Sequence, residues 1–190
     1  GMVIPFTMPF FAPFRHASVH SIVIDTHKFG GASYPSGIVL YRKFLQRYIE
    51  QPIPYVPQTD ATVLGSRPGA SAIALWALIQ SRGKATYQKK GEFYLRLKHY
   101  FIEKIQTMLP EAEIITGENS LTCGVIFHSF PQQKIKQSVT RVFGLWATPS
   151  TYHFVRKTKS MRIYKFHFLP PCSKKDIDLL CAQLASAQVS

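Results

Sequence analysis

A histidine and a lysine stand side by side just after an apolar run of the sequence. His27 and Lys28 follow the run 21–24, and the small residues Gly-Gly-Ala-Ser occupy positions 30–33. A lysine amine held at a strand end can attack a carbonyl carbon when nearby positive charge or desolvation keeps it neutral. Small residues beside it let a bulky cofactor approach the backbone. The pattern predicts a nucleophilic lysine; a solvated lysine next to an uninvolved histidine is the alternative that these two residues leave open.

Two short strands are predicted on either side of this lysine. Residues 20–24 carry a β-branched run and are expected to form a buried strand, and residues 36–42 form a second strand entered through Gly37. Strands joined by so short a loop are expected to be antiparallel neighbours. A short helix over 42–50 and a proline-rich connector over 51–60 follow.

Two helices separated by Gly83 are predicted in the middle of the chain. The first, 70–81, is apolar nearly all round and is expected to be buried, either against its own chain or against a second copy. The second, 84–108, carries one apolar stripe with lysine and arginine opposite it. The stripe comprises Phe93, Leu97, Tyr100, Phe101, Ile105 and Met108.

The pattern changes after Pro110 to that of a small α+β unit. Strands are predicted within 120–130 and over 161–168, with a helix over 132–146 between them. A last helix is expected over 173–185, with Ser173 as its N-cap and Asp176 completing a capping box. The predicted division of the chain is 1–82, a linking helix over 83–109, and a small domain over 110–190.

Composition excludes some classes of function. The 190 residues are 46% hydrophobic, and no stretch reaches the 18 uninterrupted apolar residues of a membrane-spanning helix. The three cysteines, Cys123, Cys172 and Cys181, form no CxxC pair, so no zinc site is indicated and a reducing, cytoplasmic location is expected. The formal charge of +13 is scattered along the chain without a nucleic-acid-binding motif, so no nucleic-acid partner is expected.

Two segments together resemble a known family. "SVHSIVIDTHKFGGASYPSGIVLYR" resembles the lysine segment of the group II pyridoxal-phosphate decarboxylases, and "TVLGSRPGASAIALWALIQSRG" resembles their Gly-Ser-Arg segment. This family belongs to the fold-type I, aspartate aminotransferase superfamily. It includes glutamate, histidine, tyrosine and aromatic amino acid decarboxylases and their relative sphingosine-1-phosphate lyase. The resemblance covers roughly residues 15–110 and implies an α/β fold: part of the large cofactor-binding domain over 1–82, followed by a small C-terminal α+β domain.

The resemblance also implies roles for individual residues. Lys28 would be the Schiff-base lysine for pyridoxal 5'-phosphate, and His27 would lie against the cofactor and contact its phosphate. Ser66, in a turn permitted by Gly65 and Gly69, would reach the cofactor of the neighbouring subunit in a homodimer. Supporting contacts from Thr26 and Ser21 are weaker expectations. Arg162 is expected to be either an ordinary strand residue or a contact for a substrate carboxylate.

One departure from the family pattern concerns the start of the chain. The aspartate that binds the pyridine nitrogen in this fold would lie just before "MVIPFTMPFF", and the first half of the cofactor domain would precede it. The chain is therefore expected to be the C-terminal half of a decarboxylase, inactive in isolation, whether the truncation is natural or not. Two alternatives stay open: a lyase that cleaves a carbon–carbon bond in a phosphorylated amino alcohol, and a remnant domain without catalysis. The substrate stays open within amino acid and carboxylic acid metabolism.

Overall fold

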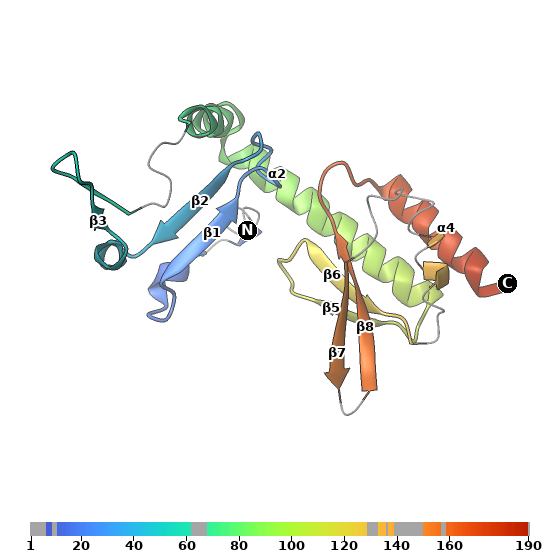
Figure 1. The fold of residues 1–190 in the computed structure, drawn as a ribbon. Helices are drawn as coiled ribbons and strands as arrows, with labels where there is room; N and C mark the ends of the chain where they lie inside the picture. Colours follow the sequence, from blue (N-terminus) through green and yellow to red (C-terminus); the bar gives the residue numbers. More distant parts are fainter. Residues whose placement is uncertain are drawn as a thin grey trace. The chain divides into compact units, whose positions relative to one another are not determined.

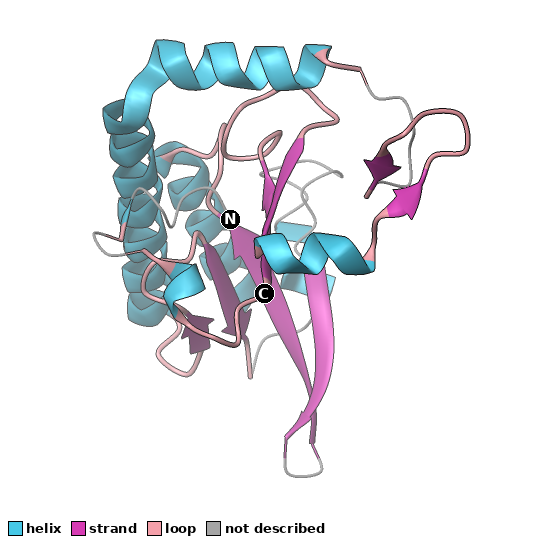
Figure 2. Ribbon diagram, turned by 90° about the vertical axis from the view of Figure 1, so that its left-hand side faces the viewer, coloured by secondary structure: helices cyan, strands magenta, loops and turns pink. Residues whose placement is uncertain are grey.

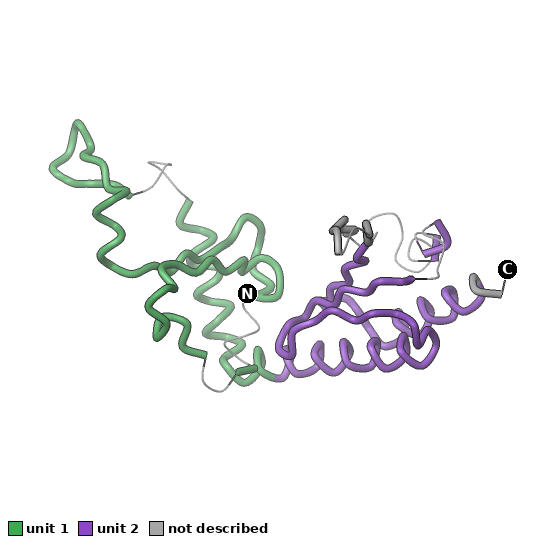
Figure 3. Tube along the Cα trace, turned by 90° about the horizontal axis from the view of Figure 1, so that it is seen from below, with its two compact units in different colours: residues 1–88 green, residues 89–190 purple. Residues whose placement is uncertain are grey.

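The computed structural model describes residues 7–8, 11–61, 68–128, 133–135, 137–138, 150–156 and 159–189. The chain forms two compact units, Gly1–Gln88 and Lys89–Ser190, which are coloured separately in Figure 3. The division falls inside one long helix. Each unit has its own strands and is described by itself.

The first unit contains the predicted pair of strands. After the 3-10 helix η1 (Pro13–Arg15), β1 (Ser21–Asp25) pairs antiparallel with β2 (Gly37–Tyr41), as Figure 1 shows. The register places Ser21 opposite Tyr41 and Asp25 opposite Gly37, so the loop 26–36 leaves and re-enters the pair at the same end. The 3-10 helix η2 (Lys43–Tyr48) and the short antiparallel strands β3 (Gln51–Pro52) and β4 (Thr59–Asp60) follow.

The expectation of a buried first strand is wrong. Val23 and Val39 are cross-strand partners on one face of the pair, and they are 65% and 59% exposed. Within this unit the two strands form a sheet of their own with no third strand among the described residues. A β-branched run therefore identified the strand correctly but could not show what would cover it.

The long helix α2 (Ala70–Met108) joins the two predicted helices and contains the predicted interruption. Gly83 has φ 65° and ψ 169°, a conformation close to a region that only glycine enters readily, and it divides α2 into two helical stretches. Burial of 70–81 against its own chain is only partial: Leu75 packs inward, whereas Ile73 and Trp76 are 67% and 64% exposed. Burial against a second copy stays a prediction. One face of this helix packs against residues of the first unit. A helix that is apolar on all sides does not reveal from its sequence which of its faces will pack against other residues.

The second unit is built on a four-stranded antiparallel sheet. Its strands are β5 (Glu113–Thr116), β6 (Thr122–Ile126), β7 (Ser150–Arg156) and β8 (Lys159–His167), in the order β5-β6-β8-β7. Figure 2 shows β7 and β8 as a long two-stranded ribbon. Strands β6 and β8 agree with the predicted strands, whereas β5 and β7 were not predicted.

The part of α2 that belongs to this unit packs against the sheet by one face. Phe101 lies with its ring centroid 4.9 Å from that of Phe166 and 5.3 Å from that of Phe168, both in or just after β8. The predicted stripe needs two corrections. Phe93 is 44% exposed, and Lys98, assigned to the polar face, is fully buried. The buried positions on this face are Tyr94, Leu97, Lys98, Phe101 and Ile105.

The final helix α4 (Lys174–Val189) begins as the sequence predicts. Ser173 donates from its backbone N–H to Asp176 Oδ2 at 2.8 Å, and the backbone N–H of Asp176 donates to Ser173 Oγ at 3.4 Å, which is a capping box. Of the predicted helix over 132–146, residues 133–135 and 137–138 are helical and the others lie outside the described residues. Among the helices that the structure describes, none combines the length and the hydropathy needed to cross a membrane.

Candidate active site

Lys28 lies on the loop that connects β1 to β2, three residues beyond the end of β1. The N–H of Gly31 donates to the carbonyl of Lys28 at 3.1 Å and closes a turn around the lysine. The Lys28 side chain is 58% exposed, whereas the next two residues, Phe29 and Gly30, are buried. The backbone of the loop is therefore held at the base while the amine projects into solvent.

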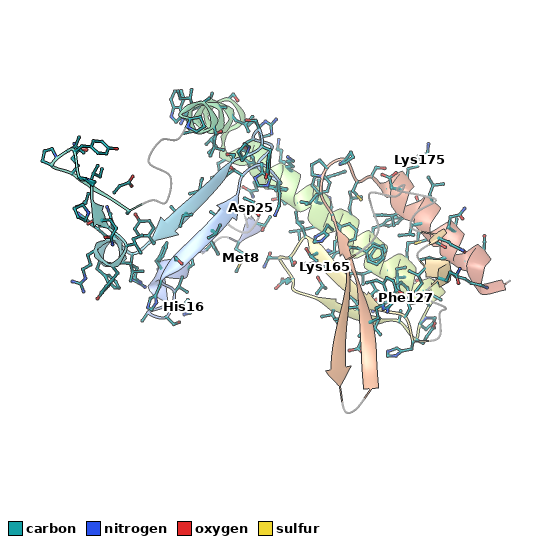
Figure 4. The ribbon with its side chains drawn as sticks, viewed as in Figure 1. Met8, His16, Asp25, Phe127, Lys165 and Lys175 are labelled. Atoms are coloured by element: carbon teal, nitrogen blue, oxygen red, sulfur yellow. The ribbon has the colours of Figure 1, made fainter. Side chains whose placement is uncertain are left out.

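The Lys28 amine has an acidic partner within its own loop. Nζ of Lys28 donates to Oδ2 of Asp25 at 2.5 Å, and Figure 4 labels Asp25 at the end of β1. The hydrogen bond from Lys28, and then its positive charge, hold the pKa of the Asp25 carboxyl below its ordinary value. Sequence reasoning quoted Asp25 only as part of the Asp-Thr-His-Lys segment. The spacing of three residues between opposite charges was the available signal.

His27 is oriented by the far end of the same loop. Its Nδ1 lies 2.6 Å from the carbonyl oxygen of Ser36, which can only accept, so the proton of this hydrogen bond is on Nδ1. The ring also packs edge-on against Tyr34, with 5.1 Å between the ring centroids. Nε2 is consequently the ring nitrogen that remains for a bound group.

A hydroxyl–hydroxyl contact between Thr26 and Ser36 joins the two ends of the loop. Thr26 is fully buried, and its Oγ1 lies 2.6 Å from Oγ of Ser36. The carbonyl of Thr26 accepts from the N–H of Ala32 at 3.1 Å. Thr26 was expected to make supporting contacts, and in the structure these contacts are with the loop itself. Sequence reasoning missed Ser36, whose hydroxyl and carbonyl contact Thr26 and His27.

The loop is also attached to helix α2 within the first unit. The hydroxyl of Tyr87, a residue only 1% exposed, donates to the carbonyl of Gly30 at 3.1 Å. The next residue, Gly31, has φ +73°, and a Cβ at this position would lie 2.9 Å from Nη1 of Arg82 on the same helix. The small residues of the loop thus permit a backbone turn and the close approach of Arg82. The sequence interpretation explained them instead by the approach of a cofactor.

The other predicted site residues lie elsewhere. Gly65 and Ser66 lie outside the described residues. Gly69 stands just before α2, with no heavy atom within 4 Å of an added Cβ. Ser21 begins β1 at an exposed position. Arg162 belongs to the second unit, where it is the register partner of His153.

The residues of the loop fit the group that the resemblance implies. An aldehyde cofactor needs a lysine amine that it can reach, and the Lys28 amine is exposed on a loop whose backbone is anchored. His27 adds an oriented imidazole beside it. Among the described residues there is no group of three or more His, Cys, Asp or Glu side chains that could hold a metal ion.

Comparison with known proteins identifies the relatives of this chain. No protein-family model matches it. It is 40% identical over 116 residues to an L-aspartate/L-glutamate decarboxylase of Pyrococcus horikoshii, a match that covers 56% of this chain and 30% of that protein. Other relatives are histidine and serine decarboxylases. The chain thus spans about a third of the length of the curated relatives it matches.

Solved structures show the same fold. Glutamate decarboxylase of Lactobacillus brevis superposes with a TM-score of 0.77 at 16% identity, over 99% of this chain and 44% of that one. Sphingosine-1-phosphate lyase of Burkholderia pseudomallei superposes with a TM-score of 0.74 at 16% identity, over 100% of this chain and 44% of that one. The fold-type I assignment made from the sequence is confirmed. The chain is homologous to part of the group II pyridoxal-phosphate decarboxylases.

Proposed function

We propose that this chain is part of a pyridoxal-phosphate-dependent amino acid decarboxylase in which Lys28 is the Schiff-base lysine. The observation that carries the proposal is the anchoring of the Lys28 loop. Buried contacts hold it at Thr26 and at Gly30, while the amine between them stays exposed. A reactive amine needs this combination, because its backbone must be fixed and its nitrogen must be reachable.

The residues around Lys28 have separate roles in binding the cofactor. His27 holds its proton on Nδ1 toward the Ser36 carbonyl and presents Nε2 to the cofactor, in line with the phosphate contact that the resemblance implies. Gly65 and Ser66 are proposed to bind the phosphate of a neighbouring subunit's cofactor. Pyridoxal phosphate, when bound, supplies the electron sink that decarboxylation requires.

The remaining residues of the loop keep this geometry rigid. The hydroxyl of Thr26, which is fully buried, contacts the hydroxyl of Ser36 and so ties the two ends of the loop together. Tyr87 holds the carbonyl of Gly30 and so limits movement of the backbone beyond Lys28. We infer that residues 1–82 belong to the cofactor-binding domain, that the helix over 83–109 links it to the small domain, and that 110–190 form that domain.

The substrate is proposed only as a class. The relatives decarboxylate different amino acids, so an α-amino acid carboxylate is the class that they share. Cleavage of a phosphorylated amino alcohol is the alternative that the Asp-Thr-His-Lys segment favours. The fold is common to both kinds of enzyme and does not separate them.

Borohydride trapping tests the assignment of Lys28. The complete protein, of which this chain is proposed to be part, is incubated with pyridoxal phosphate, reduced with borohydride, digested and mapped by mass spectrometry. We expect the pyridoxyl group on Lys28 and none on Lys104, an exposed lysine that also faces an aspartate. A label on another lysine with Lys28 unmodified would overturn the proposal, and a protein without any label would support the non-catalytic alternative.

Assembly follows from the same resemblance. We infer that the complete protein is a homodimer, because Ser66 is proposed to act on the partner's cofactor. The cytoplasmic location is inferred separately, from three cysteines that form no CxxC pair. The exposed apolar side chains Ile73 and Trp76 on α2 are consistent with a covered surface. Light scattering should give at least a dimer, and a monomer at high protein concentration would contradict the inference.

A further inference from the structure

Asp25 and Lys28 form an ion pair within the candidate site, although neither side chain is buried. Nζ and Oδ2 are 2.5 Å apart, and the two side chains are 58% and 44% exposed. Asp25 is the last residue of β1, and its register partner is Gly37 at the start of β2. The carboxylate therefore projects from a strand, while the lysine that it contacts belongs to the loop.

The contact with Asp25 affects the reactivity of the Lys28 amine. A lysine attacks an aldehyde or an acyl carbon as the neutral amine, so an ammonium must first lose a proton. A carboxylate at hydrogen-bonding distance stabilises the ammonium and opposes that loss. The same contact lowers the pKa of Asp25, which keeps the carboxylate ionised.

We propose that Asp25 is a positioning residue that holds the unmodified Lys28 as a paired ammonium and thereby limits the reactivity of its amine. His27 and Tyr34 are the other titratable groups of the loop. Nδ1 of His27 donates to Ser36, so this nitrogen makes no hydrogen bond to Lys28 or Asp25, and the Tyr34 ring packs edge-on against the His27 ring. Reaction of Lys28 breaks the pair. The proton of the ammonium leaves to solvent or to Asp25, and the freed electron pair on Nζ forms the new bond to the carbonyl carbon. The electron pair of the carbon–oxygen π bond moves to oxygen at the same time, and the oxygen then leaves as water from an aldehyde, or the carbonyl re-forms and expels the leaving group from an acyl compound. The ammonium of Lys28 thus stays paired with Asp25 until an electrophile is held beside it.

This inference rests on the proposed function only for the identity of the natural electrophile. The pair itself can be tested without cofactor, using acetic anhydride as the probe. Nζ attacks one carbonyl carbon of the anhydride, acetate leaves, and one proton passes to solvent. Trace labelling followed by mass spectrometry gives the rate at each lysine in the same sample.

The decisive comparison is between Asp25→Asn and Asp25→Glu. Exposed ion pairs are weak, so removal of the carboxylate should raise the labelling rate of Lys28 by about two- to fivefold. Asp25→Glu retains the charge and should stay close to the unchanged protein. Salt should raise the rate in the unchanged protein and have little effect in Asp25→Asn, because salt screens an exposed pair.

Asp178→Asn is the matched control. Asp178 faces Lys104 at 3.7 Å, and those side chains are 44% and 47% exposed, similar to the pair under test. This substitution should leave the labelling of Lys28 unchanged. An unchanged Lys28 rate in Asp25→Asn would overturn the inference, as would an equal increase at every lysine, which indicates unfolding. Failure here leaves the borohydride result for Lys28 unaffected, so the two proposals fail separately.

Discussion

The imidazole of His27 donates from Nδ1 to the carbonyl oxygen of Ser36 at 2.6 Å, across the base of the loop that carries Lys28. The backbone N–H of His27 points to the same oxygen at 3.4 Å. One carbonyl therefore fixes both the path of the chain and the tautomer of the ring. Orientation of His27 is a property of the loop itself and precedes any bound group.

The roles of the two ring nitrogens of His27 should be separable by mutation. In His27→Asn the side-chain amide can replace Nδ1 as the donor to Ser36 but offers nothing in place of Nε2. We expect this variant to retain the free energy of unfolding within about 0.5 kcal/mol, and His27→Phe to lose about 1 kcal/mol with the hydrogen bond. Both should show weaker trapping of pyridoxal phosphate on Lys28.

Urea unfolding and borohydride trapping measure these two effects independently. Tyr34→Leu serves as the control, because Tyr34 contacts the His27 ring by its edge and makes no contact with Nε2 through a hydrogen bond in the described structure. Trapping by His27→Asn at the rate of the unchanged protein would show that Nε2 has no part in cofactor binding.

The sequence predicted the features that depend on neighbouring residues. The break at Gly83 and the capping box at Ser173 are set by residues within a few positions of one another, and β1 and β2 are consecutive strands joined by one loop. The reactive pair His27-Lys28 was singled out for the same reason. Asp25 was equally close, and its spacing of three residues from Lys28 was the signal that could have singled it out.

Features that depend on distant partners were not predicted. Tyr87 contacts Gly30 across 57 positions, and Lys98 contacts the carbonyl of Glu118 across 20. A lysine in a helical pattern is normally assigned to solvent because burial of an ammonium is costly. Lys98 is buried because two carbonyls from a later turn accept its hydrogen bonds, and the sequence of the helix does not contain them.

Gly31 should resist substitution because of its backbone conformation. With φ at +73°, an L-residue is strained there, and Gly31→Ala should lower the free energy of unfolding by about 1–2 kcal/mol. The predicted clash is with Nη1 of Arg82, the end of a flexible side chain, so Gly31→Ala with Arg82→Ala should recover only a small part of the loss. Gly69→Ala is the control, because its added Cβ meets no heavy atom within 4 Å. Equal urea midpoints for Gly31→Ala and Gly69→Ala would contradict this account.

The capping box should make Ser173 the more important of two serines on α4. Ser173→Ala removes the acceptor of the Asp176 N–H and should cost about 1 kcal/mol of unfolding free energy. Ser186→Ala, at an exposed position near the C-terminal end of the same helix, removes only a bond to the carbonyl of Ala182 and should be close to neutral. Thermal unfolding of the two variants provides the comparison, and a larger loss for Ser186→Ala would show that the cap does not stabilise the helix.

Lys98 should make stability depend on pH at the alkaline end. Its side chain is fully buried, and Nζ donates to the carbonyls of Gly117 at 2.9 Å and Glu118 at 2.8 Å. Desolvation lowers the pKa of Lys98 below its ordinary 10.5, while the nearby Cys123 and Glu118 oppose that shift. Removal of the amine takes away two part-buried hydrogen bonds from a charged donor, so Lys98→Met should cost roughly 2 kcal/mol of unfolding free energy.

The sign of the pH effect follows from proton binding. Between the lowered pKa of Lys98 and 10.5, the unfolded chain holds a proton on this lysine more often than the folded chain does. The unfolding free energy should therefore gain a positive contribution from Lys98 as the pH rises through that window.

Other groups also titrate there, so the quantity to measure is the difference between the unchanged protein and Lys98→Met in urea unfolding at a series of pH values. That difference in unfolding free energy should grow with pH. Lys89→Met alters an exposed lysine of the same helix, and its unfolding free energy should change with pH in parallel with that of the unchanged protein. A difference that shrinks with rising pH would mean that the two carbonyls bind the ammonium strongly enough to outweigh its desolvation.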